Sequence, residues 1–132
     1  SITHAGLVSG QIIHNDERII VGISIARKNP RGRDIVIDSI RAYMNDRTNE
    51  ETIQNKTIFV DDYTSGYGQE DGKVQEIIDY ALKAYGIPLD VTYTGKAFMG
   101  MSEYIRDIKG KNLLFIHTGG TPLFFDNLRK RK

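Results

Sequence analysis

The chain of 132 residues contains no cysteine, no tryptophan and only three prolines. Without cysteine, disulfides and thiolate metal sites are excluded, and the chain is compatible with a reducing cytoplasm, where we expect it. No apolar stretch reaches the roughly 20 residues that a membrane-spanning helix needs, and no signal peptide opens the sequence. Charge of one sign is also lacking, because the formal net charge is +1. We therefore expect neither nucleic acid nor a membrane as a partner.

What the sequence does contain is typical of a soluble globular domain. Apolar residues make up 39% of the chain and charged residues 27%. A chain of this length can bury about two-thirds of its unfolded surface, which is enough for a real core. We predict a single α/β domain over residues 1–132.

Short apolar runs alternate with amphipathic segments along the chain. The runs at 19–26, 57–60 and 113–116 predict buried strands. Apolar residues at helical spacing predict helices over 34–45, 74–85 and 97–108, with a last short helix from about Pro122. The polar stretch 45–56 is expected to be exposed. Strands separated by helices predict a three-layer α/β/α arrangement with a small, mainly parallel sheet.

Glycine-rich loops follow two of the predicted strands, at 64–68 and 118–121. Ligands of open α/β sheets bind at the carboxyl ends of the strands, so these loops are candidate binding loops. Glycines at strand ends also form ordinary turns, and the spacing alone leaves both interpretations open.

The sequence Thr3-His4-Ala5-Gly6 is expected to open a helix. Backbone N–H groups and the helix dipole at such a start can bind a phosphate group. The alternative is a plain N-cap threonine with no ligand.

Lys96 follows Gly95 and invites two functional interpretations. A P-loop is excluded, because Asp90 stands where that motif requires glycine. A lysine that binds a cofactor covalently is the other. Tyr93 and Tyr67 could stack on an aromatic ring, bind a carboxylate or transfer a proton, although most tyrosines serve packing.

Four motifs in chain order support a resemblance: Thr3-His4-Ala5-Gly6-Leu7, Gly66-Tyr67-Gly68, Tyr93-Thr94-Gly95-Lys96-Ala97 and His117-Thr118-Gly119-Gly120-Thr121-Pro122. Together they resemble the carboxy-terminal part of the D-cysteine desulfhydrase / 1-aminocyclopropane-1-carboxylate (ACC) deaminase family, whose enzymes use pyridoxal 5'-phosphate (PLP). The resemblance implies part of the large domain of a fold-type-II enzyme, similar to the tryptophan synthase β subunit.

The resemblance also implies roles for particular residues. Thr3, His4, Ala5 and Gly6 would bind the cofactor phosphate, and Thr94 and Thr118 would also lie at the cofactor. Tyr93 would act at the cofactor and Tyr67 on the substrate side. The deaminase branch has glutamate where this chain has Thr94 and leucine where it has Thr118, so the chain is more similar to the desulfhydrase branch.

The implied reaction is elimination or deamination of a small amino acid, which gives an oxoacid and ammonia, by an enzyme that is a homodimer when intact. In the family, the lysine that binds PLP comes from the amino-terminal half, so we expect this chain alone to be an inactive fragment. A non-catalytic α/β binding module with a vestigial phosphate site, and a small enzyme that uses Lys96, are the alternatives. His4, His14 and His117 have no metal-site spacing, and we expect no bound metal.

Overall fold

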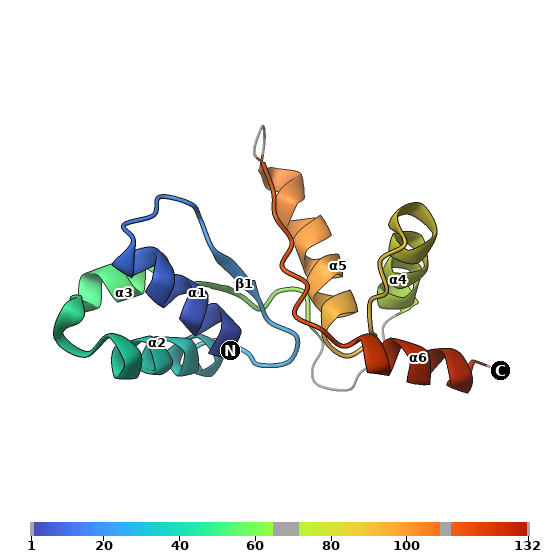
Figure 1. Cartoon of the computed structure of the whole chain (residues 1–132), viewed down its shortest axis with the longest axis horizontal. Coiled ribbons are helices and arrows are strands. Elements are labelled where there is room, and N and C mark those ends of the chain that lie inside the picture. Colours follow the sequence, from blue (N-terminus) through green and yellow to red (C-terminus); the bar gives the residue numbers. More distant parts are fainter. Residues whose placement is uncertain (1, 65–71, 109–111, 132) are drawn as a thin grey trace. The chain divides into compact units, whose positions relative to one another are not determined.

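The computed structural model describes residues 2–64, 72–108 and 112–131 (Figure 1). The chain forms two compact units, Ser1–Asp61 (unit 1) and Asp62–Lys132 (unit 2). Each unit has its own cluster of buried apolar side chains. The division into compact units does not test whether residues 1–132 form one domain, so that prediction stays a prediction.

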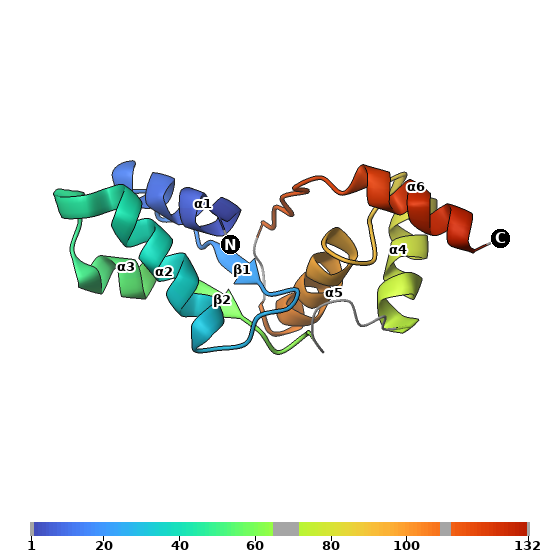
Figure 2. The same cartoon turned by 90° about the horizontal axis from the view of Figure 1, so that it is seen from below.

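Unit 1 contains the sheet (Figure 2). Its elements are α1 (Ile2–Ile13), β1 (Val21–Ile23), α2 (Arg31–Met44), a 3-10 turn η1 (Asn45–Arg47), α3 (Glu50–Lys56) and β2 (Ile58–Val60). The strands β1 and β2 pair in parallel, with Val21 opposite Ile58 and Ile23 opposite Val60. Parallel strands need a crossover connection, which α2 and α3 supply. The expected fold class, α/β with a small parallel sheet, is confirmed.

The core of unit 1 lies among its helices. The fully buried residues of α2 recur at helical spacing, which is why the pattern at 34–45 predicted this helix correctly. They pack with buried residues of α1 and α3, and the cluster consists of Ala5, Val8, Val36, Ile37, Ile40, Met44 and Ile53. Phe59 of β2 packs against the same cluster, so helices and sheet share one core.

Helix α3 lies in the polar stretch 45–56, for which the sequence predicted exposure but no helix, and most of its residues are indeed exposed or partly exposed. The side chain of Asn49 caps the helix by accepting a hydrogen bond from Thr52 N at 2.8 Å. Glu50 and Glu51 occupy the first turn, where negative charge favours the helix dipole. Ile53 is the one residue of this helix that is buried. An asparagine followed by two glutamates is an N-cap signal, but a helix with a single apolar anchor has little periodicity.

Unit 2 contains α4 (Gly72–Tyr85), α5 (Thr94–Tyr104), a 3-10 turn η2 (Ile105–Asp107) and α6 (Thr121–Lys130). These elements confirm the helices predicted at 74–85, 97–108 and from about Pro122, although α5 begins three residues earlier than the pattern suggested. The buried cluster of this unit consists of Val74, Ile78, Ala81, Leu89 and Phe124.

The strand predicted at 113–116 does not form among the described residues. This segment makes no ladder, and Leu114 is 84% exposed. Only Phe115 packs inward, with its ring centroid 5.1 Å from that of Phe98 on α5. An apolar run favours extended backbone, but a strand also requires a neighbour that accepts and donates its backbone hydrogen bonds. The predicted strands 19–26 and 57–60 shrink for the same reason to the three residues of each that pair.

No helix among the described residues is long and apolar enough to cross a membrane.

Candidate functional site

A buried carboxylate organises the turn that leads into α5. Asp90 is 0% exposed. Its Oδ2 accepts hydrogen bonds from Thr92 N at 2.8 Å and Tyr93 N at 2.7 Å. Its Oδ1 accepts from Thr94 N at 2.9 Å and from the Thr94 hydroxyl at 2.8 Å. One side chain therefore satisfies the backbone N–H groups of Tyr93 and Thr94, which the start of α5 would otherwise leave without partners, and that of Thr92 in the preceding turn.

Thr94 completes this arrangement from the other side. Its Oγ1 accepts a hydrogen bond from Asp90 N at 2.9 Å, while its hydroxyl proton goes to the Asp90 carboxylate. The Asp90 carbonyl accepts from Gly95 N at 2.8 Å. Because a hydroxyl has one proton to donate, Thr94 has no second donor for a ligand in this arrangement.

Two glycines lie so close to Asp90 that a larger residue would collide with it. A Cβ atom on Gly95 would lie 2.5 Å from the Asp90 carbonyl oxygen, and one on Gly120 would lie 2.5 Å from Asp90 Oδ1. Gly120 also has a φ of +88°, in the left-handed region that favours glycine. The start of α6, which Gly120 precedes, is thus packed against the carboxylate at the start of α5.

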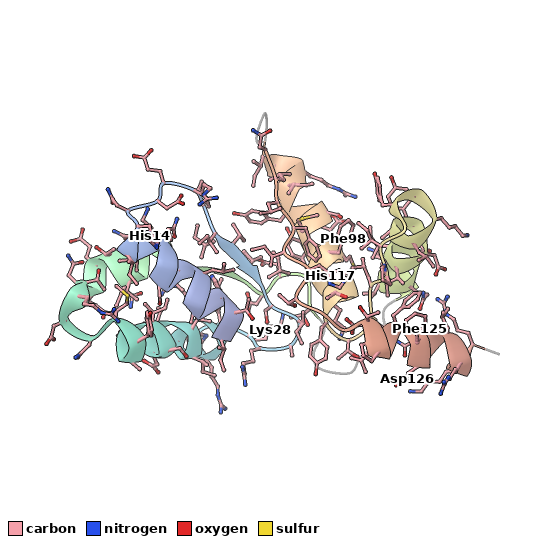
Figure 3. The ribbon with its side chains drawn as sticks, in the orientation of Figure 1. His14, Lys28, Phe98, His117, Phe125 and Asp126 are labelled. Carbon is pink, nitrogen blue, oxygen red and sulfur yellow. The ribbon has the colours of Figure 1, made fainter. Side chains whose placement is uncertain are left out.

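A second contact joins the same two segments. His117 Nε2 donates a hydrogen bond to the carbonyl oxygen of Pro88 at 2.9 Å, and His117 Nδ1 accepts one from Gly119 N at 3.2 Å. The ring of Phe115 lies 6.5 Å from that of His117 and 5.1 Å from that of Phe98 on α5, and Figure 3 labels His117 and Phe98. The segment 117–120 is therefore joined to 88–90 at both of its ends, with Thr118 and Gly119 between the two contacts.

The residues predicted at the cofactor in unit 2 differ in exposure. Tyr93 is 41% exposed and Thr118 is also exposed, so both side chains are accessible. Thr94 and Lys96 are 3% and 5% exposed. Lys96 lies in the first turn of α5.

The predicted phosphate-binding sequence opens α1 in unit 1, as expected. Thr3 and Gly6 are exposed, whereas Ala5 is 5% exposed and belongs to the apolar core. The helix has 12 residues, and no side chain carries a negative charge in its first turn. The binding of a phosphate group by the N–H groups of this helix start stays a prediction.

His4 has an unusual environment. Its ring stacks on Phe59 with a centroid separation of 6.3 Å and lies against Gly22, where a Cβ atom would overlap it. Both ring nitrogens are buried without a hydrogen-bond partner. Burial, and secondarily the positive charge of the N-terminus, lower the pKa of His4 to about 4. At neutral pH this histidine is uncharged and packs as an aromatic ring, so it does not supply a cation to a phosphate.

The predicted site is not assembled by one unit. Thr3, His4, Ala5 and Gly6 belong to unit 1, and Tyr93, Thr94 and Thr118 to unit 2. Tyr67 lies outside the described residues. The convergence of these groups at one sheet edge therefore stays a prediction.

The structural role of Asp90 went unrecognised in the sequence. Asp90 precedes Thr92, Tyr93 and Thr94, and an aspartate followed by such polar residues is an Asx-turn signal that could have identified it. Its importance follows from the donors that gather around it in the folded chain.

A second acidic residue, Asp61, holds the loop after β1. It accepts hydrogen bonds from Asn29 N at 2.7 Å and Asn29 Nδ2 at 3.1 Å. The carboxylate of Asp61, at the end of β2, therefore holds a loop that is distant in sequence. Within the described ranges, no three His, Asp or Glu side chains gather as metal ligands.

Comparison with known proteins places the chain among longer sequences. No family model matches it. It is 36% identical over 131 residues to a protein of Thermotoga maritima named "Putative 1-aminocyclopropane-1-carboxylate deaminase", and 33% identical over 126 residues to a protein of the same name from Pyrococcus abyssi. These alignments cover 97% and 93% of this chain but only 41% and 37% of the relatives.

A solved structure shows the same relationship. The crystal structure of an ACC deaminase homologue matches 97% of this chain with a TM-score of 0.77 and 31% sequence identity, and the match covers 40% of that structure. Sequence and fold thus agree over nearly the whole chain. Over nearly its whole length the chain is similar to proteins named as putative ACC deaminases and to the solved structure of an ACC deaminase homologue, and it spans about two-fifths of the length of the relatives that it matches.

Proposed function

We propose that this chain is part of a PLP-dependent enzyme that acts on a small amino acid and releases an oxoacid and ammonia. The observation that carries this proposal is the 36% identity over 131 residues to a protein named as an ACC deaminase. The alignment covers 97% of this chain. The resemblance assigns the four motifs of the chain to the cofactor and the substrate. Because the chain covers 41% of that relative, the activity is a property of the longer protein.

The residues present fit two parts of the cofactor. The start of α1, with its exposed Thr3 and its helix N–H groups, suits a phosphate group. In unit 2, the exposed side chains of Tyr93 and Thr118 suit a pyridine ring. When bound, PLP would supply an electron sink for negative charge at the carbon that bears the substrate amino group. Tyr93 would orient the pyridine ring and hold a proton, and Thr118 would present a neutral hydroxyl to the ring nitrogen.

The neutral hydroxyls favour the desulfhydrase branch within this proposal. A carboxylate at the pyridine nitrogen keeps that nitrogen protonated, which a threonine cannot do as strongly. Thr94 stands where the deaminase branch has glutamate, and its proton is already donated to Asp90. We therefore propose D-cysteine as substrate, cleaved by β-elimination with water to pyruvate, ammonia and hydrogen sulfide.

The setting of the enzyme is part of the same proposal. The resemblance supports a homodimer of the intact protein and a cytoplasmic location. The net charge of +1 supports the absence of nucleic-acid and membrane partners.

The test compares this chain with a protein of the relatives' length that contains it. Each is incubated with PLP, reduced with borohydride and examined by mass spectrometry, and each is assayed for sulfide and pyruvate from D-cysteine and for ammonia from ACC. The longer protein should carry one reducible PLP and release sulfide, whereas the chain alone should do neither.

Other outcomes select the alternatives. An adduct of about one PLP per chain that maps to Lys96, and is lost in Lys96→Arg, would favour the small-enzyme interpretation. PLP bound by the longer protein without turnover of either substrate would favour a non-catalytic binding module. Ammonia from ACC without sulfide from D-cysteine would contradict the assignment to the desulfhydrase branch.

A further inference from the structure

Asp90 connects the two segments of unit 2 that carry proposed cofactor contacts. Four hydrogen bonds, between 2.7 and 2.9 Å long, reach its carboxylate from the turn that includes Tyr93. Gly120 packs against the same carboxylate from the other segment. We propose that Asp90 is a positioning residue, which fixes Tyr93 and the loop of Thr118 relative to each other. The inference rests on the proposed function.

The chemistry of the side chain explains why aspartate is needed. A carboxylate only accepts hydrogen bonds, and both of its oxygens face donors. In the variant Asp90→Asn, an NH₂ group that points at N–H donors would replace one of these oxygens. If the NH₂ group replaces Oδ2, Thr92 N and Tyr93 N lose their acceptor. If it replaces Oδ1, the backbone N–H and the hydroxyl of Thr94 lose theirs.

The influence of Asp90 on the position of Thr118 depends on the contacts of the residues on either side of Thr118. Thr118 lies between His117, whose ring is held by the Pro88 carbonyl, and Gly120, which is held against Asp90. Pro88 and Asp90 are two residues apart in the segment that leads into the turn before α5. A change at Asp90 therefore releases one of the two points that fix the Thr118 loop, while the contact of His117 remains.

The test uses the chain with three substitutions. Asp90→Asn is nearly isosteric, removes the negative charge and replaces one acceptor oxygen by an NH₂ donor. Asp79→Asn is the matched control, because Asp79 is a surface residue of the same unit whose carboxylate contacts Gln75 and Arg131. Val74→Ala lowers the stability of unit 2 without touching the turn, since Val74 is a buried core residue on α4.

The first measurement is amide exchange and chemical shift by NMR without any ligand. Hydrogen bonds to charged groups are strong enough that losing them should speed exchange at Thr92, Tyr93 or Thr94 by about 10- to 100-fold. The shifts of Thr118 and Gly120 should move in Asp90→Asn and stay in place in Asp79→Asn. In Val74→Ala, exchange should rise throughout the unit. If Asp90→Asn resembles Val74→Ala, or leaves Thr118 and Gly120 unmoved, the positioning role is wrong.

The second measurement separates this inference from the proposed function. Pyridoxamine 5'-phosphate has the ring and phosphate of PLP but no aldehyde, so it reports non-covalent contacts alone. Titrated to millimolar concentration, it should shift the amides of Tyr93 and Thr118 in the unchanged chain and in Asp79→Asn. In Asp90→Asn it should bind at least about tenfold more weakly, the effect of losing one charged hydrogen bond. No shift in the unchanged chain would contradict the proposed cofactor contacts, even if the ligand-free result stands. Equal binding by Asp90→Asn would overturn the positioning role alone.

Discussion

Beside its aliphatic core, unit 1 buries the neutral polar residues Ser9, Gln11, Ser24 and Thr57, whereas unit 2 buries two residues with ionisable side chains, Asp90 and Lys96. Asp90, Thr94 and Lys96 of unit 2 are all at most 5% exposed. In unit 1, by contrast, the buried His4 is held as an uncharged ring whose two nitrogens have no hydrogen-bond partner.

The difference shows two ways to fix a structure. Apolar packing stabilises strongly but tolerates substitutions that preserve volume. A buried polar network demands particular donors and acceptors, so it specifies one geometry. A buried polar network of this kind fixes the turn that carries Tyr93 in unit 2, where the proposed function requires a defined position of the tyrosine side chain.

The largest expected effect tests the apolar core of unit 1. Ile40 on α2 is 0% exposed, and Ile40→Ala should lower the free energy of unfolding by about 2–5 kcal/mol through lost burial and a cavity. Urea denaturation with residue-specific amide exchange measures the loss and locates it. Ile2→Ala, at a residue 82% exposed, is the control and should change stability by less than about 0.5 kcal/mol. Equal losses from both substitutions would contradict the assignment of this core.

Protonation of His4 should have the next largest effect. The pKa of His4 is lowered from 6.5 to about 4 in the folded state, chiefly by burial, so the unfolded chain binds the proton more tightly. This contribution to stability is complete above pH 6.5 and is lost as the pH falls toward 4. It amounts to about 3 kcal/mol at one pKa unit per 1.36 kcal/mol. Unfolding free energy measured from pH 7 to pH 4 should show it.

The control for this prediction is His4→Gln, which cannot titrate and should have a flatter pH profile over that range. The carboxyl groups of Asp16 and Glu50, whose pKa values Arg18 and Arg41 lower to about 2 through hydrogen bonds, should lose their contribution only as the pH falls below about 4. If the free energy of unfolding of His4→Gln still falls between pH 6.5 and pH 5 as it does in the unchanged chain, the effect belongs to another titrating group.

Gly120→Ala tests the packing of unit 2 against its buried carboxylate. An alanine there would adopt a left-handed φ of +88° and place its Cβ 2.5 Å from Asp90 Oδ1. A left-handed conformation costs an L-residue about 1–2 kcal/mol, and the collision adds to it, so we expect a loss of about 2 kcal/mol. Thermal unfolding measures the loss, with Gly119→Ala as a control that is strained in φ but meets no atom within 4 Å. If Gly119→Ala lowers the stability as much as Gly120→Ala does, the collision with Asp90 makes no contribution to the loss.

The smallest expected effect has the opposite sign. Gly10 lies inside α1, where a Cβ would meet nothing within 4 Å. Gly10→Ala should therefore stabilise unit 1 by about 0.5–1 kcal/mol, because alanine loses less backbone freedom in a helix. A loss of stability, detected by urea denaturation, would show that this face of α1 needs the space.

The helices could be predicted from the sequence because their stability depends on local periodicity. The pattern at 34–45 identified α2, whose buried residues face one core. The strands were harder, since pairing depends on partners distant in sequence. The apolar run at 113–116 has the composition of a strand, yet in the described structure only Phe115 of that run turns toward a helix. Helix α3 was missed because a cap and one buried isoleucine hold it.

The candidate site was predicted by motif, not by physics. Tyr93 and Thr118 are accessible, as a ligand site requires, but composition gave no reason to prefer them over other residues of their kind. Asp90 was overlooked, because the importance of a buried carboxylate depends on the donors around it. Only coordinates show that Thr94 and Gly120 meet at this side chain.

The parallel pairing of β1 and β2 also bears on how unit 1 folds. Val21 and Ile58 meet only after the intervening chain has closed into a long loop, and each strand contributes three residues to the ladder. So short a ladder compensates poorly for the entropy of closing that loop. The helices α2 and α3 form from local contacts and shorten the distance that the loop must cover. We expect the docking of α2 to belong to the folding nucleus and the sheet to complete itself late, which makes the sheet a product of helix packing in this unit.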